Sequence, residues 1–212
     1  MFENIIKNVH NRHPLIHCIT NYVSINDCAN IVLACGGAPI MAEDINEVSQ
    51  ITSICQGLDI NIGMLNDNKL SSMLKAGATA NELGIPVILD PVGAGSSDYR
   101  IKAVQNLMSN VQFGVIRGNV SEIKAIAAKQ GIHNIAAGVY ETMQKNKSAM
   151  GVEAGIADKI TDDNIKEMAD FINKLSQKTG AVIAVTGGID MVADENRVYA
   201  IRNGHKMMSL VT

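Results

Sequence analysis

The stretch that most constrains the fold of this chain is residues 85–97, which read Ile-Pro-Val-Ile-Leu-Asp-Pro-Val-Gly-Ala-Gly-Ser-Ser. Its apolar run, Val87–Leu89, is typical of a strand that is buried on both faces of a parallel sheet. We expect the strand to end at Asp90, because Pro91 has no N–H to donate to a sheet and Gly93 lets the backbone turn sharply. Open α/β sheets bind ligands at the carboxyl ends of strands, so the stretch predicts a ligand site around Asp90. The alternative is an ordinary strand-to-helix loop.

The rest of the chain alternates between strand-like and helix-like segments. Strands are expected at residues 14–19, 38–41, 58–62, 87–89, 113–116, 181–185, 189–193, 197–201 and 206–211. Helices are expected at residues 2–11, 24–35, 48–55, 67–83, 98–108, 120–129 and 162–179, and residues 131–157 are expected to form a helical excursion or flap. This order predicts an α/β fold with a mainly parallel central sheet and helices on both faces. We expect one domain over residues 1–212.

Composition limits the partners of the chain. The net charge is -3, aromatic residues make up 3%, and there is no tryptophan, so neither a basic surface nor a base-stacking platform is indicated. We therefore expect no nucleic-acid partner. The four cysteines form no Cys-x-x-Cys pair and are typical of reduced thiols. With no signal-peptide pattern and no membrane-spanning run, we expect a cytoplasmic protein that does not bind membranes.

Polar residues also end two other predicted strands. One strand leads into Arg117, Gly118 and Asn119, and another leads into Thr186. Because carboxyl ends of parallel strands meet at one edge of a sheet, these residues and Asp90 predict a single site along that edge. Arg117 is either an exposed surface residue or a bidentate partner of a phosphate group. Thr186 either belongs to a simple turn or offers its hydroxyl and neighbouring N–H groups to a phosphate.

The segment Asn119-Val-Ser-Glu122 has two interpretations, which are compatible. It matches a capping box, in which Asn119 caps a helix and Glu122 reaches back to the backbone. Alternatively, Glu122 and Asp90 hold Mg²⁺ beside a phosphate group, because Mg²⁺ prefers one or two carboxylates and keeps much of its water. The sequence leaves both interpretations open.

Several nucleotide-binding motifs are missing. The segment Gly93-Ala-Gly-Ser-Ser-Asp98 fails the dinucleotide fingerprint, because Asp98 replaces the third glycine. The chain has no Gly-Lys-Ser/Thr sequence, which excludes a P-loop, and no His-Arg-Asp or Asp-Phe-Gly sequence, which excludes a protein kinase.

As a set, several blocks resemble the hydroxyethylthiazole kinase family, whose members have a ribokinase-like fold and act in thiamine biosynthesis and salvage. The matching blocks are residues 14–23 (Pro-Leu-Ile-His-Cys-Ile-Thr-Asn-Tyr-Val), 37–41 (Gly-Ala-Pro-Ile-Met), 86–95, 116–119 together with Glu122, 185–187 (Val-Thr-Gly) and 203–206 (Asn-Gly-His-Lys). They span nearly the whole chain in the family's order. Each block alone is a weak signal, whereas the set is highly specific.

The resemblance implies ATP-dependent phosphorylation of the primary alcohol of 4-methyl-5-(2-hydroxyethyl)thiazole. It also implies a requirement for Mg²⁺ and a homotrimer with sites at the subunit interfaces. The residues it implies for the site are Met41 and Asn21 near the thiazole, Arg117 and Thr186 at ATP, and Asp90 and Glu122 at the metal and phosphates.

The sequence departs from the family after its last residue. Family members continue past the position of Thr212 into a Gly-Thr-Gly-Cys-like or Gly-Ala-Gly-Cys-like turn and further helices. We therefore expect the catalytic base just after Thr212, and we expect residues 1–212 to lack the domain's C-terminal helices and to be inactive alone. Two alternative functions are a related kinase of another small vitamin-precursor alcohol and a nucleotide-binding module without kinase activity.

Overall fold

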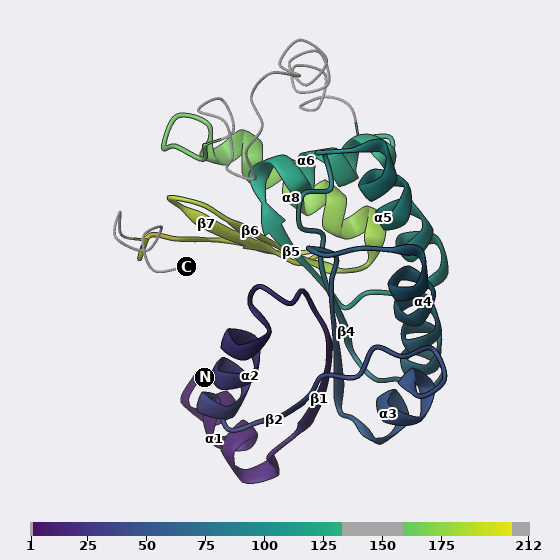
Figure 1. The fold of residues 1–212 in the computed structure, drawn as a ribbon. Coiled ribbons are helices and arrows are strands. Elements are labelled where there is room, and N and C mark those ends of the chain that lie inside the picture. The colour runs from purple at the N-terminus through teal and green to yellow at the C-terminus, as the bar shows by residue number, and fades with distance from the viewer. Residues whose placement is uncertain (1, 133–158, 205–212) are drawn as a thin grey trace. The chain divides into compact units, whose positions relative to one another are not determined.

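The computed structural model describes residues 2–132 and 159–204 (Figure 1). The chain divides into two compact units. Unit 1 contains residues 1–90 and 106–113, and unit 2 contains residues 91–105 and 114–212. The single domain expected over residues 1–212 stays a prediction, because part of that range lies outside the described residues.

Unit 1 is built on four parallel strands in the order β2-β1-β3-β4. Its elements are α1 (Phe2–Arg12), β1 (Leu15–Ile19), α2 (Ile25–Ala34), β2 (Ala38–Ile40), α3 (Val48–Ile54), β3 (Gly57–Asn61), α4 (Asp67–Glu82) and β4 (Val87–Asp90). Figure 1 shows α1 and α2 on one side of these strands and α3 and α4 on the other. The predicted alternation of strand and helix is confirmed here, with boundaries within about two residues of those expected.

Helix α4 contacts β3 and β4 through a stripe of mainly small side chains. Its buried residues are Lys69, Ser72, Met73, Ala76, Gly77 and Ala80. The sequence predicts one apolar face made of Leu70, Met73, Leu74, Gly77 and Leu83. Met73 and Gly77 are buried as predicted, but Leu83 is 55% exposed. The true stripe includes a lysine and a serine, which a search for apolar periodicity passes over.

Strand β4 was predicted to be buried on both faces, and this expectation was wrong for one face. Val87 and Leu89 are fully buried, but Ile88 between them is 40% exposed. Successive side chains of a strand point to opposite faces, so β4 is buried on one face and open at Ile88 on the other. The continuous apolar run therefore overstated the burial of the strand.

Unit 2 has a mixed sheet. Its elements are β5 (Val115–Asn119), α6 (Val120–Lys129), α8 (Ile165–Thr179), β6 (Val182–Thr186), β7 (Asp190–Ala193) and β8 (Val198–Ile201), and α5 (Asp98–Asn110) starts in this unit. Strands β5 and β6 are parallel, whereas β7 and β8 are antiparallel additions. Helices α6 and α8 pack against β5, β6 and β7. Strand β5 lies further along the chain than expected, so Arg117 is inside the strand.

Two predicted segments fall largely or wholly outside the described residues. They are the excursion at 131–157, of which only residues 131 and 132 are described, and the strand at 206–211. Within residues 2–132 and 159–204, no helix is both long and apolar enough to cross a membrane.

Candidate functional site

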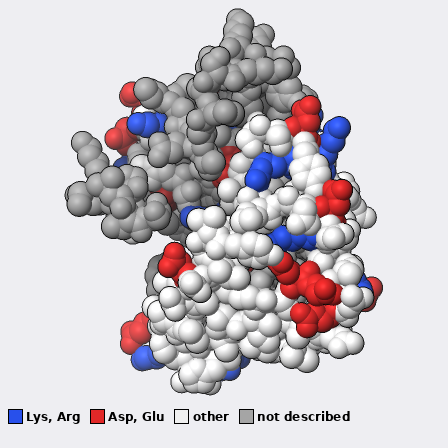
Figure 2. Space-filling view, viewed as in Figure 1, with Lys and Arg blue, Asp and Glu red and all other residues white. Residues whose placement is uncertain are grey.

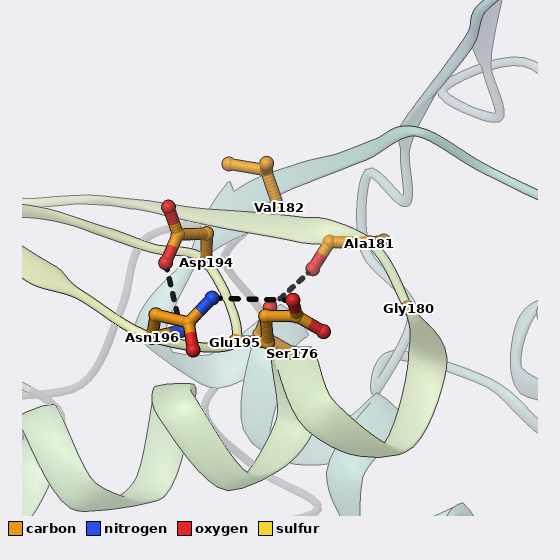
Figure 3. Close-up of a pocket in the computed structure, with 7 residues that line it drawn as sticks. All are labelled: Ser176, Gly180, Ala181, Val182, Asp194, Glu195 and Asn196. Atoms are coloured by element: carbon orange, nitrogen blue, oxygen red, sulfur yellow. Dashed lines mark hydrogen bonds between the residues drawn. The ribbon is translucent and has the colours of Figure 1, made fainter.

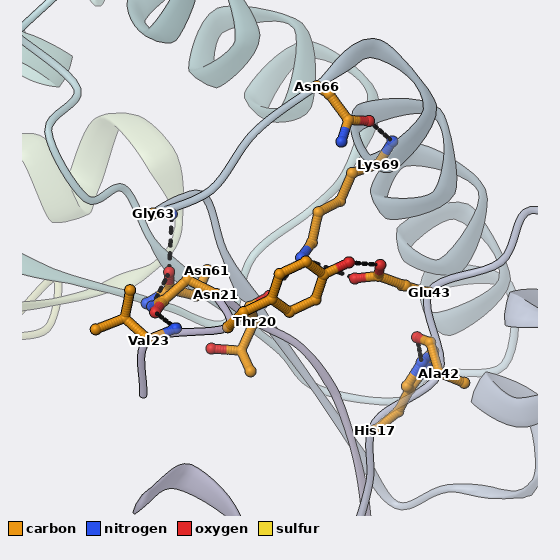
Figure 4. Close-up of polar contacts among 11 residues, drawn as sticks. His17, Thr20, Asn21, Val23, Ala42, Glu43, Asn61, Gly63, Asn66 and Lys69 are labelled. Carbon is orange, nitrogen blue, oxygen red and sulfur yellow. Dashed lines mark hydrogen bonds and ion pairs between the residues drawn. The ribbon is translucent and has the colours of Figure 1, made fainter. Parts of the chain in front are cut away.

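Three polar residues follow or end the parallel strands of unit 1, and their side chains form a hydrogen-bonded chain. Asn61 ends β3 and is 8% exposed, and its Nδ2 donates to Oδ2 of Asp90 at the end of β4, at 2.9 Å. Oδ1 of Asn61 accepts from Nδ2 of Asn21 at 3.2 Å and from the Gly63 backbone N–H at 2.8 Å (Figure 4). Asn61 therefore joins the predicted thiazole residue Asn21 to the predicted metal residue Asp90.

The side-chain oxygen of Asn21 is used locally. It accepts from the backbone N–H groups of Val23 and Ser24, both at 3.0 Å, and from Oγ of Ser24 at 3.2 Å. This Asx-type turn starts α2, whose N-cap Ser24 makes no side-chain cap of its own. Any hydrogen bond from the Asn21 side chain to a ligand must therefore come from its amino group.

A buried histidine of β1 forms a hydrogen bond with the segment that carries Met41. Met41 is half-buried, and the carbonyl oxygen of the next residue, Ala42, lies 2.7 Å from Nε2 of His17. His17 is fully buried, and its Nδ1 lies 2.8 Å from Oγ1 of Thr52. A carbonyl can only accept, so we assign the hydrogen to Nε2, and Nδ1 accepts from the Thr52 hydroxyl. Burial lowers the pKa of His17 and so favours this neutral form, which ties α3 and β1 to the Met41 segment.

His17 makes the stability of the protein sensitive to pH. Burial lowers the pKa of His17 below 6.5, although the Ala42 carbonyl and Glu47 act to raise it. Below about pH 6.5 the unfolded chain binds a proton that the native histidine does not, so stability is complete above that pH and falls as the pH drops. We expect the wild-type protein to lose about 1 kcal/mol more than His17→Gln between about pH 7.5 and 5.5.

Urea unfolding at the two pH values measures this difference. The exposed His10 on α1 provides a matched control, because His10→Gln removes a histidine that is not buried. The assignment is wrong if His17→Gln and the wild-type protein lose the same stability over this range.

Glu122, in the first turn of α6, closes a capping box and also holds a loop. Asn119 Oδ1 accepts from the Glu122 backbone N–H at 2.9 Å, and Glu122 Oε2 accepts from the Asn119 backbone N–H at 2.8 Å. Oε1 of the same carboxylate accepts from the Gly93 backbone N–H at 2.8 Å. The predicted capping box is confirmed, and Glu122 is only 7% exposed. Its metal role stays a prediction.

The two residues predicted to contact ATP lie on neighbouring strands of unit 2. Arg117 is exposed in β5, and Thr186 ends β6 and is half-buried, in register with Asn119. Of the N–H groups expected to face a phosphate after Thr186, that of Gly187 donates to Oδ1 of Asp190 at 2.9 Å. That N–H therefore supports the turn into β7. The Thr186 hydroxyl, which donates to the Gly118 carbonyl oxygen at 3.5 Å, and the Arg117 guanidinium remain the candidates for phosphate contact.

The predicted residues divide between the two units. Asn21, Asp90 and Met41 belong to unit 1, whereas Arg117, Thr186 and Glu122 belong to unit 2. Among residues 2–132 and 159–204, no three acidic, histidine or cysteine side chains cluster as metal ligands. Mg²⁺ needs only one or two carboxylates beside phosphate oxygens and water, and Asp90 and Glu122 are each of that ligand type.

Sequence reasoning missed Asn61, His17 and Lys69, which are all buried polar residues of unit 1. Asn61 had a usable signal, because Asn-Ile-Gly ends a strand as Asp90 does. His17 and Lys69 had none, because their partners are far away in the sequence.

A pocket lies at the opposite end of β6 from Thr186, and the polar groups that line it have structural roles (Figure 3). It is lined by Ser176, Gly180, Ala181, Val182, Asp194, Glu195 and Asn196. Asp194 Oδ1 accepts from the backbone N–H groups of Asn196 and Arg197, which lower its pKa, and the Ser176 hydroxyl donates to the Ala181 carbonyl. These polar groups serve the β7–β8 turn and the end of α8.

Comparison with known proteins gives consistent matches along the whole chain. A model of the hydroxyethylthiazole kinase family matches residues 6–162 and 136–212. Hydroxyethylthiazole kinase of Clostridium acetobutylicum is 51% identical over 100% of this chain and 72% of its own length. The enzyme of that name from Desulfovibrio desulfuricans is 44% identical over 100% of this chain and 69% of its own length.

Solved structures agree with the sequence matches. The structure of hydroxyethylthiazole kinase from Pyrococcus horikoshii OT3 has a TM-score of 0.80 and 32% identity, covering 99% of this chain and 69% of that chain. A last common ancestor of vitamin kinases, at 14% identity and a TM-score of 0.53, covers 89% of this chain and 85% of its own and shows the shared fold alone. The predicted α/β, ribokinase-like fold is confirmed.

Proposed function

The chain belongs to the hydroxyethylthiazole kinase family, and we propose on that basis that it phosphorylates 4-methyl-5-(2-hydroxyethyl)thiazole with ATP. The observation that carries this proposal is the family match along the full length of the chain. The two groups of polar residues at strand ends support it, because a kinase of this class needs them for ATP and the alcohol. The family acts in thiamine biosynthesis and salvage, and we assign the same role here.

The reaction is an in-line transfer. The substrate hydroxyl oxygen attacks the γ-phosphorus of ATP, the bond to the β,γ-bridging oxygen breaks, the hydroxyl proton is released and ADP leaves. Catalysis of this kind depends mostly on positioning and on neutralising phosphate charge. Arg117 would neutralise charge on ATP, and Met41 would supply an apolar wall for the thiazole ring.

Mg²⁺ is the metal that we propose for this reaction, and the carboxylates of Asp90 in unit 1 and Glu122 in unit 2 are its candidate ligands. Carboxylate oxygens are the hard ligands that this ion prefers, and each carboxylate can accept more than one partner. When bound, Mg²⁺ would neutralise the charge that develops on the phosphates. Within the chain, the Asn61 amide orients Asp90, and the N–H groups of Asn119 and Gly93 orient Glu122.

Removing the Arg117 side chain is expected to weaken ATP binding selectively. A hydrogen bond to a charged group contributes about 1.5–3 kcal/mol, so Arg117→Ala should raise KM for ATP about 10- to 100-fold and change KM for the alcohol much less. Steady-state kinetics with each substrate varied in turn measure both constants. Arg197→Ala is the matched control, because Arg197 is an exposed arginine of the same unit that pairs with Asp194. An unchanged KM for ATP in Arg117→Ala would refute the assignment.

We also propose a homotrimer in which Met41 meets the thiazole beside a neighbouring subunit. Helix α2 has no buried residue, and Val23, Ile31 and Leu33 on or beside it are exposed. Ile5 and Ile6 of α1 are exposed as well, and the lower left of the surface in Figure 2 is mainly uncharged, whereas acidic side chains gather at its lower right. Exposed apolar groups of this kind mark protein contacts. Sedimentation tests this: a monomer that keeps full affinity for the thiazole alcohol would refute it.

The cytoplasm is the compartment that we propose, since ATP is the phosphoryl donor. The four cysteines are free thiols, and burial raises the pKa of Cys18 to about 12, so its thiol stays protonated.

ADP formation with and without the thiazole alcohol tests the proposed function. In the full-length protein, we expect ADP to form from Mg²⁺-ATP and the thiazole alcohol, and to form far more slowly without the alcohol. ADP formation with another small vitamin-precursor alcohol but not with the thiazole would favour a related kinase. ATP binding without ADP formation would favour a non-catalytic module.

A further inference from the structure

One buried lysine contacts both segments of unit 1 that carry the predicted thiazole residues. Lys69 lies in the first turn of α4 and is 4% exposed. Its Nζ donates to the Thr20 carbonyl oxygen at 2.5 Å and lies 2.8 Å from Oε2 of Glu43 (Figure 4). The same Nζ lies 4.5 Å from the centre of the Tyr22 ring, and the Tyr22 hydroxyl donates to Oε1 of Glu43. We call these four residues the Lys69 brace.

The partners of the Lys69 ammonium satisfy it completely. An ammonium has three N–H bonds, and here it meets one carbonyl, one carboxylate and one ring face. Burial acts to raise the pKa of Glu43, but hydrogen bonds from Lys69 and Tyr22 lower it overall, so Glu43 is charged. A buried charge without partners is strongly unfavourable, so the position of Lys69 depends on all three contacts being kept.

Three residues of the Lys69 brace are close in the sequence to the predicted substrate residues Asn21 and Met41. Thr20 and Tyr22 are the two neighbours of Asn21, and Glu43 comes two residues after Met41. Lys69 itself is anchored, because its backbone N–H donates to Oδ1 of the N-cap Asn66 at 2.9 Å. Through Lys69, the first turn of α4 therefore contacts both the Asn21 segment (residues 20–24) and the Met41 segment (residues 41–43).

We propose that Lys69 is a positioning residue, which holds the Asn21 and Met41 segments in the arrangement that binds the thiazole alcohol. This inference rests on the proposed function, but its structural part can be tested without activity. Lys69 does not touch the reacting atoms in this role. It acts through Asn21 and Met41, whose displacement by about 1 Å can reduce activity as much as a hundredfold.

The test compares two lysines of the same helix in the full-length protein. Lys69→Met removes the charge and keeps the apolar stem, whereas Lys75→Met removes an exposed lysine whose Nζ donates to the Ile45 carbonyl. We expect Lys69→Met to raise KM for the thiazole alcohol about 10- to 100-fold, with KM for ATP little changed. Lys75→Met should leave both constants unchanged. A merely structural role would instead lower the active fraction and the melting temperature and leave both KM values as they are, which would overturn the proposal.

A second variant keeps the test valid if Lys69→Met does not fold. Lys69→Met leaves Glu43 without its counter-ion, so Lys69→Met/Glu43→Gln removes both charges together. If the single variant does not fold, the same rise in KM for the alcohol is expected from the double variant.

Hydrogen exchange separates this inference from the proposed function. Amides of residues 20–24 and 41–43 should exchange faster in Lys69→Met, or in the double variant, than in Lys75→Met or the wild-type protein. Equal exchange in all four proteins would overturn the positioning role. If the wild-type protein formed no ADP with the thiazole alcohol, the proposed function would fail, and the exchange result would still decide whether Lys69 fixes the two segments.

Discussion

Asp90→Asn is expected to lower kcat about a hundredfold or more while leaving the fold intact. The substitution changes the charge and hardly changes the shape. Oδ2 of Asp90 accepts from Nδ2 of Asn61, and the amide oxygen of the new side chain can accept the same hydrogen bond. The backbone carbonyl of Asp90, which accepts from the Ile62 N–H at 3.1 Å, is not affected. The carboxylate charge is lost, and metal-assisted neutralisation of phosphate charge contributes several kcal/mol to catalysis.

The measurement is kcat as a function of Mg²⁺ concentration, together with urea unfolding. Asp59→Asn is a suitable control, because Asp59 is a half-buried acid of the neighbouring strand β3, two residues before Asn61. We expect it to change the Mg²⁺ dependence little. Asp90→Asn with normal turnover and normal Mg²⁺ dependence would show that Asp90 is only the turn residue that the sequence also allowed.

The order of strands and helices was predictable because it depends on local signals. Apolar periodicity and glycines mark nearly every described element. The sequence offers Asn66 or Asp67 as the cap of α4, and Asn66 is the cap. Burial was less predictable, because it depends on what packs against each face. Ile88 reads as a core residue in the sequence, yet it is 40% exposed, and the buried stripe of α4 contains Lys69 and Ser72.

The residues of the candidate site were predictable where their position at the end of a strand or the start of a helix indicates a role. Asp90 and Thr186 end strands, and Glu122 closes a capping box, as their local sequences indicate. The supporting residues were not predictable, because long-range contacts define them. Lys69 bonds a carbonyl 49 residues away in the sequence, and Asn61 bonds a carboxylate 29 residues away. No local pattern distinguishes such a lysine from one on a solvated helix surface.

Glu122→Gln is expected to reduce both stability and turnover. Both oxygens of the Glu122 carboxylate accept backbone N–H groups, one from Asn119 and one from Gly93. Glutamine offers one acceptor oxygen and one amino group, so one of these N–H groups would face a donor and lose its partner. A buried N–H without a partner costs about 1–3 kcal/mol, and the free energy of unfolding should fall by that amount. The same substitution would weaken the hydrogen bond that joins the Gly93 loop, which follows Asp90 and Pro91, to Glu122 of α6.

The capping role and the metal role of Glu122 can be separated with the other half of the capping box. Asn119→Ala removes the oxygen that accepts from the Glu122 N–H and leaves the carboxylate of Glu122 in place. It should cost about 1 kcal/mol of stability, as the loss of an N-cap does, and preserve the Mg²⁺ dependence of turnover. Glu122→Gln should match or exceed that loss of stability and also raise the Mg²⁺ concentration needed for half-maximal rate. If both variants lose stability and neither changes the Mg²⁺ dependence, Glu122 is a capping residue alone, and Asp90 is the carboxylate left to hold the metal.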